Sequence, residues 1–186
     1  MTKVAVIVGS LRRDSVNRRL AEALAKLARP KLEFRFVEIG DLPLYNQDLE
    51  ASLSAAVVRF KSEIEAADAV LFVTPEFNRS FPAALKNAIE WGSRPWGKTS
   101  WPGKPGAIVG ATLGTVGTAA AQSQLRSIVA HIGVPLMADP EVYLNFRDGQ
   151  IVDGEFTDES FKALMRGWVD KFSDWISRLR TPALTF

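Results

Sequence analysis

The fold is decided by residues 3–28, which read KVAVIVGSLRRDSVNRRLAEALAKLA. Lys3 to Val8 is a continuous run of mostly β-branched residues, typical of a strand that is covered on both faces of a sheet. Gly9 ends that run, and from Val16 onward apolar residues return every three or four positions, which predicts an amphipathic helix. This passage from a buried strand to a helix is the first half of a βαβ unit.

The same alternation continues along the rest of the chain. Further strands are expected at 32–39, 69–74 and 107–109, with a last one between Val134 and Leu144 that Pro135 and Pro140 interrupt. Helical spacing covers 16–27, 53–67, 82–89, 125–132 and 161–179. Five strands alternating with five helices predict a three-layer α/β fold, with helices on both faces of a parallel sheet. Because there are only five strands, the order 2-1-3-4-5 is favoured over a longer Rossmann-type sheet.

Size and composition favour one domain. The chain has 186 residues, of which 47% are hydrophobic, enough for one complete core. We expect a single domain over residues 1–180 and a frayed tail over 181–186. No apolar run reaches the roughly 20 residues that a membrane span requires, and the N-terminus enters a strand directly, so a cytoplasmic protein is expected.

Cysteine, histidine and charge exclude several classes of site. With no cysteine, the chain has no disulfide, iron–sulfur cluster or thiol nucleophile. With one histidine, His131, a multi-histidine metal site cannot be built, and we expect no metal and a structural role for this residue. The 23 basic residues nearly balance the 21 acidic ones, and no basic block dominates, which disfavours nucleic acid as a partner.

In parallel sheets of this kind, ligands bind beyond the carboxyl ends of the strands. The first segment at that edge is residues 9–17, GSLRRDSVN. Hydroxyl, amide and free backbone N–H groups at a helix start can converge on a phosphate, and Arg12 or Arg13 adds charge. The alternative is an ordinary helix start capped by Asp14 or Ser15. Neither a G-x-G-x-x-G nor a Walker A pattern is present, so a smaller ligand with one phosphate fits better.

Two more segments reach the same edge. Residues 74–82, TPEFNRSFP, combine rigid backbone, an amide and flat aromatic side chains, which would suit a planar heterocycle. Residues 111–118, ATLGTVGT, contain two glycines that would let the backbone lie flat under a ligand. Each segment is also compatible with an ordinary loop or turn.

With these motifs in order, the sequence resembles the NADPH-dependent FMN reductases, a family of flavodoxin-like fold that includes bacterial quinone, chromate and ferric reductases. The resemblance spans nearly the whole chain. Its residues are Gly9-Ser10-x-Arg12-x-x-Ser15-x-Asn17, Pro75-Glu76-Phe77-Asn78-Arg79-Ser80, Leu85-Lys86-Asn87-Ala88-Ile89-Glu90-Trp91, Gly114-x-x-Gly117, Asp41-Leu42-Pro43 and the loop from Arg94-Pro95 to Pro105. The chain departs from the family pattern in having Phe77 where tyrosine is usual and Thr118 where a second glycine is common.

The resemblance implies non-covalently bound FMN. It assigns Ser10, Arg12, Ser15, Val16 and Asn17 to the phosphate, Pro75, Glu76, Phe77 and Asn78 to the isoalloxazine ring, and Thr112, Leu113, Gly114 and Gly117 to its pyrimidine side. NADPH, or NADH, would pass a hydride to flavin N5 and leave, and a quinone, free flavin, ferric chelate or chromate would take its place. This ping-pong transfer needs no obligatory catalytic side chain. Arg94 is a candidate contact for the acceptor or for NADPH.

The segment from Trp91 to Trp101 contains three tryptophans, at 91, 96 and 101. These rings either cover an edge of the core or pack across a subunit interface, so that one protomer roofs the flavin of the other. The resemblance favours the second reading and a homodimer or homotetramer. Residues 141–156 are expected to form a connector that contacts the partner.

Two rival functions stay open at this point. One is an electron carrier of the flavodoxin type without its own NADPH oxidation, and the other is a phosphate- or nucleotide-binding module without redox activity. A serine hydrolase is disfavoured, because the sequence around Ser10 lacks the Gly-x-Ser-x-Gly elbow.

Overall fold

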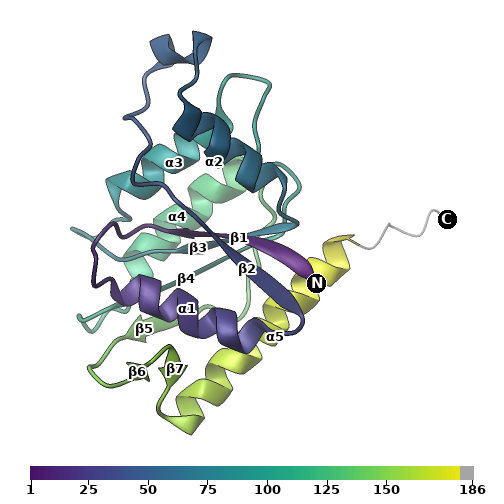
Figure 1. Ribbon diagram of the computed structural model, residues 1–186. Helices are drawn as coiled ribbons and strands as arrows, with labels where there is room; N and C mark the ends of the chain where they lie inside the picture. The colour runs from purple at the N-terminus through teal and green to yellow at the C-terminus, as the bar shows by residue number, and fades with distance from the viewer. Residues whose placement is uncertain (181–186) are drawn as a thin grey trace, which may run out of the picture.

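The computed structural model describes residues 1–180, so the expected frayed tail, 181–186, lies outside the described residues. One parallel sheet forms the centre of the molecule, with strand order β2-β1-β3-β4-β5 (Figure 1). Its strands are β1 (Thr2–Val8), β2 (Leu32–Val37), β3 (Ala69–Val73), β4 (Gly106–Thr112) and β5 (Tyr143–Asn145). The flavodoxin-like α/β fold and the order 2-1-3-4-5 are therefore confirmed.

Helices cover both faces of the sheet (Figure 1). The helices are α1 (Val16–Ala28), α2 (Ala55–Glu65), α3 (Ala83–Ser93), α4 (Ala119–His131) and α5 (Glu159–Arg180), with a short 3₁₀ helix, η1 (Gln47–Ala51), between β2 and α2. Helices α1 and α5 share one core cluster, and α2, α3 and α4 share the other. The right-handed crossovers of the parallel strands produce this division.

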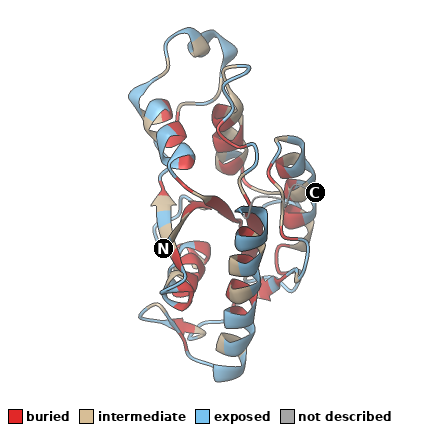
Figure 2. Cartoon of the chain, turned by 90° about the vertical axis from the view of Figure 1, so that its right-hand side faces the viewer, coloured by how far each residue is buried: buried red, intermediate tan, exposed pale blue. Residues whose placement is uncertain are grey.

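The two cores follow from the alternation of side chains along the central strands. In β1, Val4, Val6 and Val8 face α1 and α5, whereas Ala5 and Ile7 face α2 and α3. Both faces of β1 are thus covered, which explains its unbroken apolar sequence. Each fully buried valine or isoleucine stabilises the fold by about 1.5–3 kcal/mol. Figure 2 shows the buried residues gathered in the sheet and on the helix sides that face it.

The expected last strand, between Val134 and Leu144, was wrong in extent. Strand β5 covers only Tyr143–Asn145, and Leu136 makes an isolated bridge with Gly106. Pro135 and Pro140 have no N–H to donate to a neighbouring strand, so a continuous ladder cannot form there.

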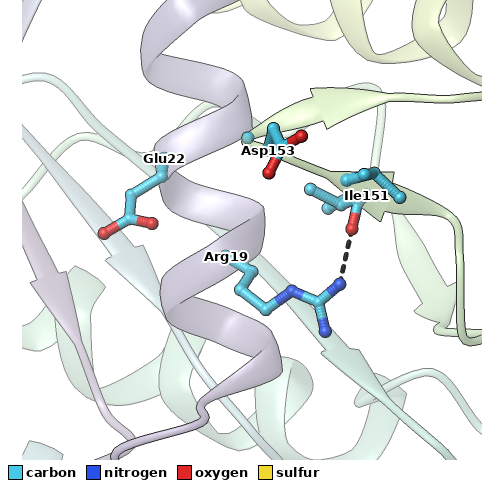
Figure 3. A pocket seen from close by; sticks show the side chains of 6 residues that line it. Arg19, Glu22, Ile151 and Asp153 are labelled. Atoms are coloured by element: carbon cyan, nitrogen blue, oxygen red, sulfur yellow. Dashed lines mark hydrogen bonds between the residues drawn. The ribbon is translucent and has the colours of Figure 1, made fainter.

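The segment 141–156 is more than the expected connector. Besides β5 it contains an antiparallel hairpin, β6 (Ile151–Val152) and β7 (Glu155–Phe156). The hairpin packs on α1 through basic side chains: Arg19 donates to the carbonyl of Ile151, and Lys26 donates to that of Asp153 at 2.7 Å. Figure 3 shows Arg19 pointing from α1 to Ile151 at one side of a hollow of about 250 Å³. The hairpin therefore supports α1, whose first turn lies at the candidate site.

The three tryptophans of the 91–101 segment have two different environments. Trp91 and Trp101 are fully buried, and a Cβ atom placed on Gly92 would lie only 2.2 Å from the Trp101 ring. For these two residues the core-covering reading is confirmed. Trp96 is instead 86% exposed.

Every helix within residues 1–180 is too short or too polar to cross a membrane.

Candidate functional site

Three loops leave the carboxyl ends of the neighbouring strands β1, β3 and β4. Gly9 N–H donates to the carbonyl of Val73 at 2.8 Å, and Thr74 N–H donates to that of Val109 at 2.9 Å, so the strand ends are in register. Residues 9–15, 74–82 and 113–118 therefore begin side by side at one edge of the sheet. The sequence-based expectation that these segments meet is confirmed.

The first loop ends in a capped helix. Ser15 is the N-cap of α1, and its Oγ accepts from the N–H of Arg18 at 3.2 Å. The helix geometry gives the N–H groups of Val16 and Asn17 no intrahelical acceptor, so both are available to a ligand. The positive end of the helix dipole favours an anion there. The capping role of Ser15 and an anion-binding role are thus compatible.

The side chain of Asn17 has a role that the sequence did not indicate. It is buried, its Nδ2 donates to the carbonyl of Ala111, and its Oδ1 accepts from the N–H of the same residue, both at 2.9 Å. Asn17 therefore joins α1 to β4, the strand that leads into the third loop. The amide was expected to face an anion; because it is bonded to Ala111 instead, only the backbone N–H of Asn17 is left for that purpose.

The second loop contains a tight turn. Phe77 and Ser80 exchange two backbone hydrogen bonds, of 2.8 and 3.0 Å, around Asn78 and Arg79, whose φ angles are 51° and 65°. Positive φ at both central residues is the signature of a type I′ turn. Gln124 on α4 holds the turn, because its Nε2 donates to the carbonyl of Arg79 at 2.7 Å and its Oε1 accepts from Ser80 Oγ at 2.8 Å. The backbone N–H of Asn78 takes no part in these bonds.

Glu76 connects the second loop to the end of the third. Its Oε2 accepts from the N–H groups of Ala120 and Ala121, at 3.0 and 3.1 Å, and so caps the first turn of α4. A carboxylate at a helix N-terminus is favoured by the helix dipole. Beside it, Pro75 is buried and the ring of Phe77 is 56% exposed.

The third loop is held closely against β5. Gly117 has a φ of +62°, and a Cβ there would lie 2.5 Å from the carbonyl carbon of Tyr143. Asn145 Nδ2 donates to the carbonyls of Leu113 and Gly114, at 3.0 and 2.8 Å. The next residue, Thr118, has a backbone in the left-handed region, with a φ of 72°. This is the position at which the resemblance implies a second glycine.

Gly114, by contrast, faces open space. Within residues 1–180, a Cβ placed on it would meet Thr112 Oγ1 alone, at 3.8 Å. Near it, Leu113 is 66% exposed and Val116 is 39% exposed. The exposed side chains of Phe77, Leu113 and Val116 belong to the second and third loops, which leave the same edge of the sheet as the loop before α1. The edge can thus hold a ligand that has an anionic group at one end and a flat apolar body at the other.

Arg94 and Trp96 lie away from these loops. Helix α3 starts after the second loop and extends for 11 residues, about 16 Å, toward the amino ends of the strands. Arg94 follows the helix, and the segment leads from there into the start of β4. The guanidinium carbon of Arg94 is 5.7 Å from the centre of the Trp96 ring, and its Nε is buried without a hydrogen-bond partner within residues 1–180. Arg94 therefore does not meet the three loops at the carboxyl edge of its own sheet.

A buried lysine fixes the segment that carries Trp96. Lys61 on α2 donates to the carbonyl of Lys98 at 2.7 Å and to Ser100 Oγ at 2.9 Å, and Ser100 Oγ donates in turn to Glu65. Burial lowers the pKa of the Lys61 ammonium group, while the negative charge of Glu65 opposes this shift. No sequence signal indicated Lys61, Gln124 or Asn145, because a polar residue on a helix or after a strand normally faces water.

Comparisons with known proteins show the family of the chain. The family model for "NADPH-dependent FMN reductase" matches residues 2–148. A 2-hydroxy-1,4-benzoquinone reductase from a Burkholderia species is 47% identical over 175 residues, which cover 94% of this chain and 96% of that protein. A quinone reductase from Pseudomonas putida is 45% identical over 174 residues, covering 93% and 94% of the two chains.

Among solved structures, this chain is similar to FerB from Paracoccus denitrificans, described as a flavoenzyme NAD(P)H:(acceptor) oxidoreductase. The two structures superpose with a TM-score of 0.93 at 46% sequence identity, over 96% of this chain and 98% of FerB. Fold, sequence and site geometry thus point to the same group of proteins.

Proposed function

The chain belongs to the NADPH-dependent FMN reductase family, and on that premise we propose that it holds FMN across the three loops at the carboxyl edge of its sheet. It is an NAD(P)H-dependent oxidoreductase of the quinone reductase type, for which FMN is the family's cofactor. The observation that carries the FMN site is that the free N–H groups at the start of α1 and the exposed apolar side chains of Phe77 and Leu113 belong to loops that leave one edge of the sheet.

The first loop suits the phosphate of FMN. The N–H groups of Val16 and Asn17, the hydroxyls of Ser10 and Ser15 and the guanidinium of Arg12 provide donors and positive charge. Ser15 Oγ caps α1 as a hydrogen-bond acceptor, so its O–H can donate to the phosphate.

The second and third loops suit the ring system. Gly114 leaves room for a flat ligand to approach the backbone, and the exposed ring of Phe77 offers an apolar wall. Pro75, Glu76, Thr112 and Gly117 shape these loops, since Glu76 caps α4 and Gly117 seats the third loop on β5. When bound, FMN supplies the redox chemistry, taking a hydride from NADPH or NADH and giving two electrons to the acceptor.

The chain's own residues position the reactants and stabilise charge. The backbone N–H of Asn78, at the tip of its turn, can donate to the ring edge and stabilise negative charge there. Because Gln124 fixes that turn, the donor is held in place before the ligand arrives. No side chain is required as acid or base for hydride transfer, and none is assigned. Quinones are the proposed acceptors, with free flavin, ferric chelates and chromate as further candidates.

We also propose that the protein is a homodimer, or a tetramer built from such dimers. Between the ends of α3 and α4, a cleft of about 920 Å³ combines Arg94 and Trp96 with the apolar side chains of Ile128 and Ile132. These residues lie at the sheet edge opposite the flavin loops of their own chain. A second copy packed antiparallel across α3 and α4 would bring Arg94 and Trp96 to its neighbour's flavin, where Arg94 could contact the acceptor or NADPH.

A visible spectrum of the purified protein tests the function directly. The protein should show FMN absorption, either as isolated or after addition of FMN, and NADPH added without oxygen should bleach it rapidly. Slow bleaching with NADPH would favour the flavodoxin-type carrier instead. A colourless protein that does not take up FMN would favour the phosphate-binding module. Sedimentation tests the dimer, because a monomer with full activity would contradict it.

A further inference from the structure

The turn of the second loop, residues 77–80, has little support from its own backbone. Its bridge between Phe77 and Ser80 is isolated, and the residues on either side of it, 74–76 and 81–82, belong to no strand. Both central residues have positive φ without being glycine. Asparagine tolerates this conformation better than most residues, whereas arginine rarely adopts it. Because a hairpin without further strands is marginally stable in water, the turn depends on contacts with the rest of the protein.

Helix α4 supplies these contacts at two places. Glu76, directly before the turn, accepts from two N–H groups in the first turn of α4. Gln124, about one helical turn further along α4, donates through Nε2 to the carbonyl of Arg79 at 2.7 Å and accepts at Oε1 from Ser80 Oγ at 2.8 Å. The residue before the turn and the last two residues of the turn are thus attached to the same helix.

The contact at position 124 requires an amide. A glutamine side chain carries both a donor and an acceptor, and Gln124 uses one for the Arg79 carbonyl and the other for Ser80 Oγ. Gln124 is exposed, so water could satisfy its amide equally well. Its two bonds therefore do not serve to satisfy a buried group, and their effect is to fix the turn.

The free donor in this turn is the backbone N–H of Asn78, which has no acceptor within residues 1–180. A donor that is fixed before charge develops stabilises that charge without reorganisation, whereas a mobile donor must first be ordered. Reduction increases the negative charge of a flavin ring, and protein groups near the ring tune how readily this occurs. The stiffness of the turn thus bears on the oxidised and reduced forms of the cofactor to different extents.

We propose that Gln124 is a positioning residue that raises the reduction potential of bound FMN by holding this turn against α4. The inference rests on the proposed function, because it concerns the FMN site assigned there. A hydrogen bond from Asn78 N–H is stronger to a charged acceptor than to a neutral one, so a turn held in place favours reduced FMN. A higher potential makes the uptake of hydride from NAD(P)H more favourable. Gln124 acts through the turn and takes no part in the chemistry itself.

Spectroelectrochemical titration of the FMN-loaded protein measures this potential without turnover. Gln124→Met removes both bonds and should weaken the binding of reduced FMN about tenfold relative to oxidised FMN, since a hydrogen bond to a charged group contributes about that factor. A tenfold change corresponds to a two-electron potential about 30 mV lower. Ser80→Ala removes one of the two bonds and should shift the potential in the same direction by less. Gln47→Met is the matched control, because Gln47 is also exposed but lies in η1, and its potential should equal that of the wild type.

Amide hydrogen exchange of the FMN-free protein tests the support of the turn separately. The N–H groups of Phe77 and Ser80 form the backbone bonds of the turn, and in Gln124→Met they should exchange at least about fivefold faster than in the wild type. In Gln47→Met their exchange should be unchanged. Equal exchange in Gln124→Met and the wild type would overturn the proposal, because the turn would then be stable without Gln124.

Two results of the titration would also overturn it. One is an unchanged potential in Gln124→Met, including the case in which oxidised and reduced FMN lose affinity equally, which would give Gln124 a purely structural role. The other is an equal shift in Gln47→Met. Failure of the proposed function is distinct: a wild-type protein that binds no FMN refutes the site and this inference with it. An FMN-loaded wild type beside a Gln124→Met variant of equal potential refutes only the role of Gln124.

Discussion

Two glycines of the third loop should respond very differently to the same added methyl group. Gly117 has a φ of +62°, and a Cβ there would lie 2.5 Å from the carbonyl carbon of Tyr143 and 2.9 Å from the backbone nitrogen of Leu144. Gly114 lies outside the left-handed region, and its Cβ would meet only Thr112 Oγ1, at 3.8 Å. We therefore expect Gly117→Ala to disrupt the fold locally and Gly114→Ala to leave it intact.

The magnitudes follow from these surroundings. An alanine in the left-handed conformation costs about 1–2 kcal/mol, and forcing a methyl group against the backbone of β5 adds about 1–3 kcal/mol. The sum for Gly117→Ala is about 2–5 kcal/mol, and a loss of about 3 kcal/mol would lower Tm by roughly 6–12 °C in a protein of this size. Gly114→Ala should stay within about 0.5 kcal/mol of the parent.

Thermal unfolding of the FMN-free protein measures the change in stability of each variant. Quenching of FMN fluorescence on binding measures the change in FMN affinity. Gly117→Ala should lose both stability and FMN affinity, because the loop moves away from β5. Gly114→Ala should keep its Tm and still bind FMN at least about fivefold more weakly, because the methyl group occupies space proposed for the ring and overpacking costs at least about 1 kcal/mol.

The pair of variants separates two parts of the reasoning. If Gly114→Ala binds FMN as tightly as the parent, the third loop does not lie against the flavin and the proposed site is wrong there. If Gly117→Ala keeps the parent's Tm, the packing argument at β5 is wrong, whatever happens to FMN.

Three further predictions concern side chains that hold the site. Asn17→Ala leaves the N–H and carbonyl of Ala111 without their buried partner and should lower the free energy of unfolding by about 2–3 kcal/mol, measured by urea denaturation; a change below about 0.5 kcal/mol would contradict this role. Glu76→Gln removes the charge that caps α4 and should cost about 1 kcal/mol, whereas the same substitution at the exposed Glu63, near the end of α2, should have little effect in parallel melts. Burial lowers the pKa of Lys61 below 10.5, so its charged form costs native stability at neutral pH, and this cost disappears as pH rises from the folded-state pKa toward 10.5. Relative to Lys61→Met, the wild-type protein should therefore gain stability over that alkaline range, and urea midpoints whose difference does not vary with pH would disprove the idea.

The layers of the fold could be predicted because each strand and helix carries its own pattern. Lys3 to Val8 is apolar throughout because β1 is buried on both faces, and the helical spacing from Val16 to Leu27 reflects one buried stripe on α1. The last strand was misplaced because β5 has only three residues and two prolines interrupt the region before it. The β6–β7 hairpin was missed because strands of two residues carry no periodic signal.

The candidate site was predictable in its location but not in its inner contacts. Parallel topology alone brings the segments after β1, β3 and β4 to one edge. The bonds that hold those segments join residues far apart in the chain, such as Asn17 to Ala111 and Glu76 to Ala120. No local pattern encodes such pairs, so the expectation that the Asn17 amide faces an anion could be corrected only from the structure.

By itself, the sequence determined the order of strands and helices, the sheet edge at which the three candidate loops meet and the family to which the chain is similar. All of these depend on local periodicity, on the handedness of crossovers and on short motifs. Only the tertiary structure decided which side chains are free and which are engaged: within residues 1–180 Arg13 makes no ion pair, Lys61 is buried under the 94–101 segment, and Trp96 is 86% exposed. These properties depend on distances between residues that are remote in sequence, and those distances are set when the helices pack on the sheet.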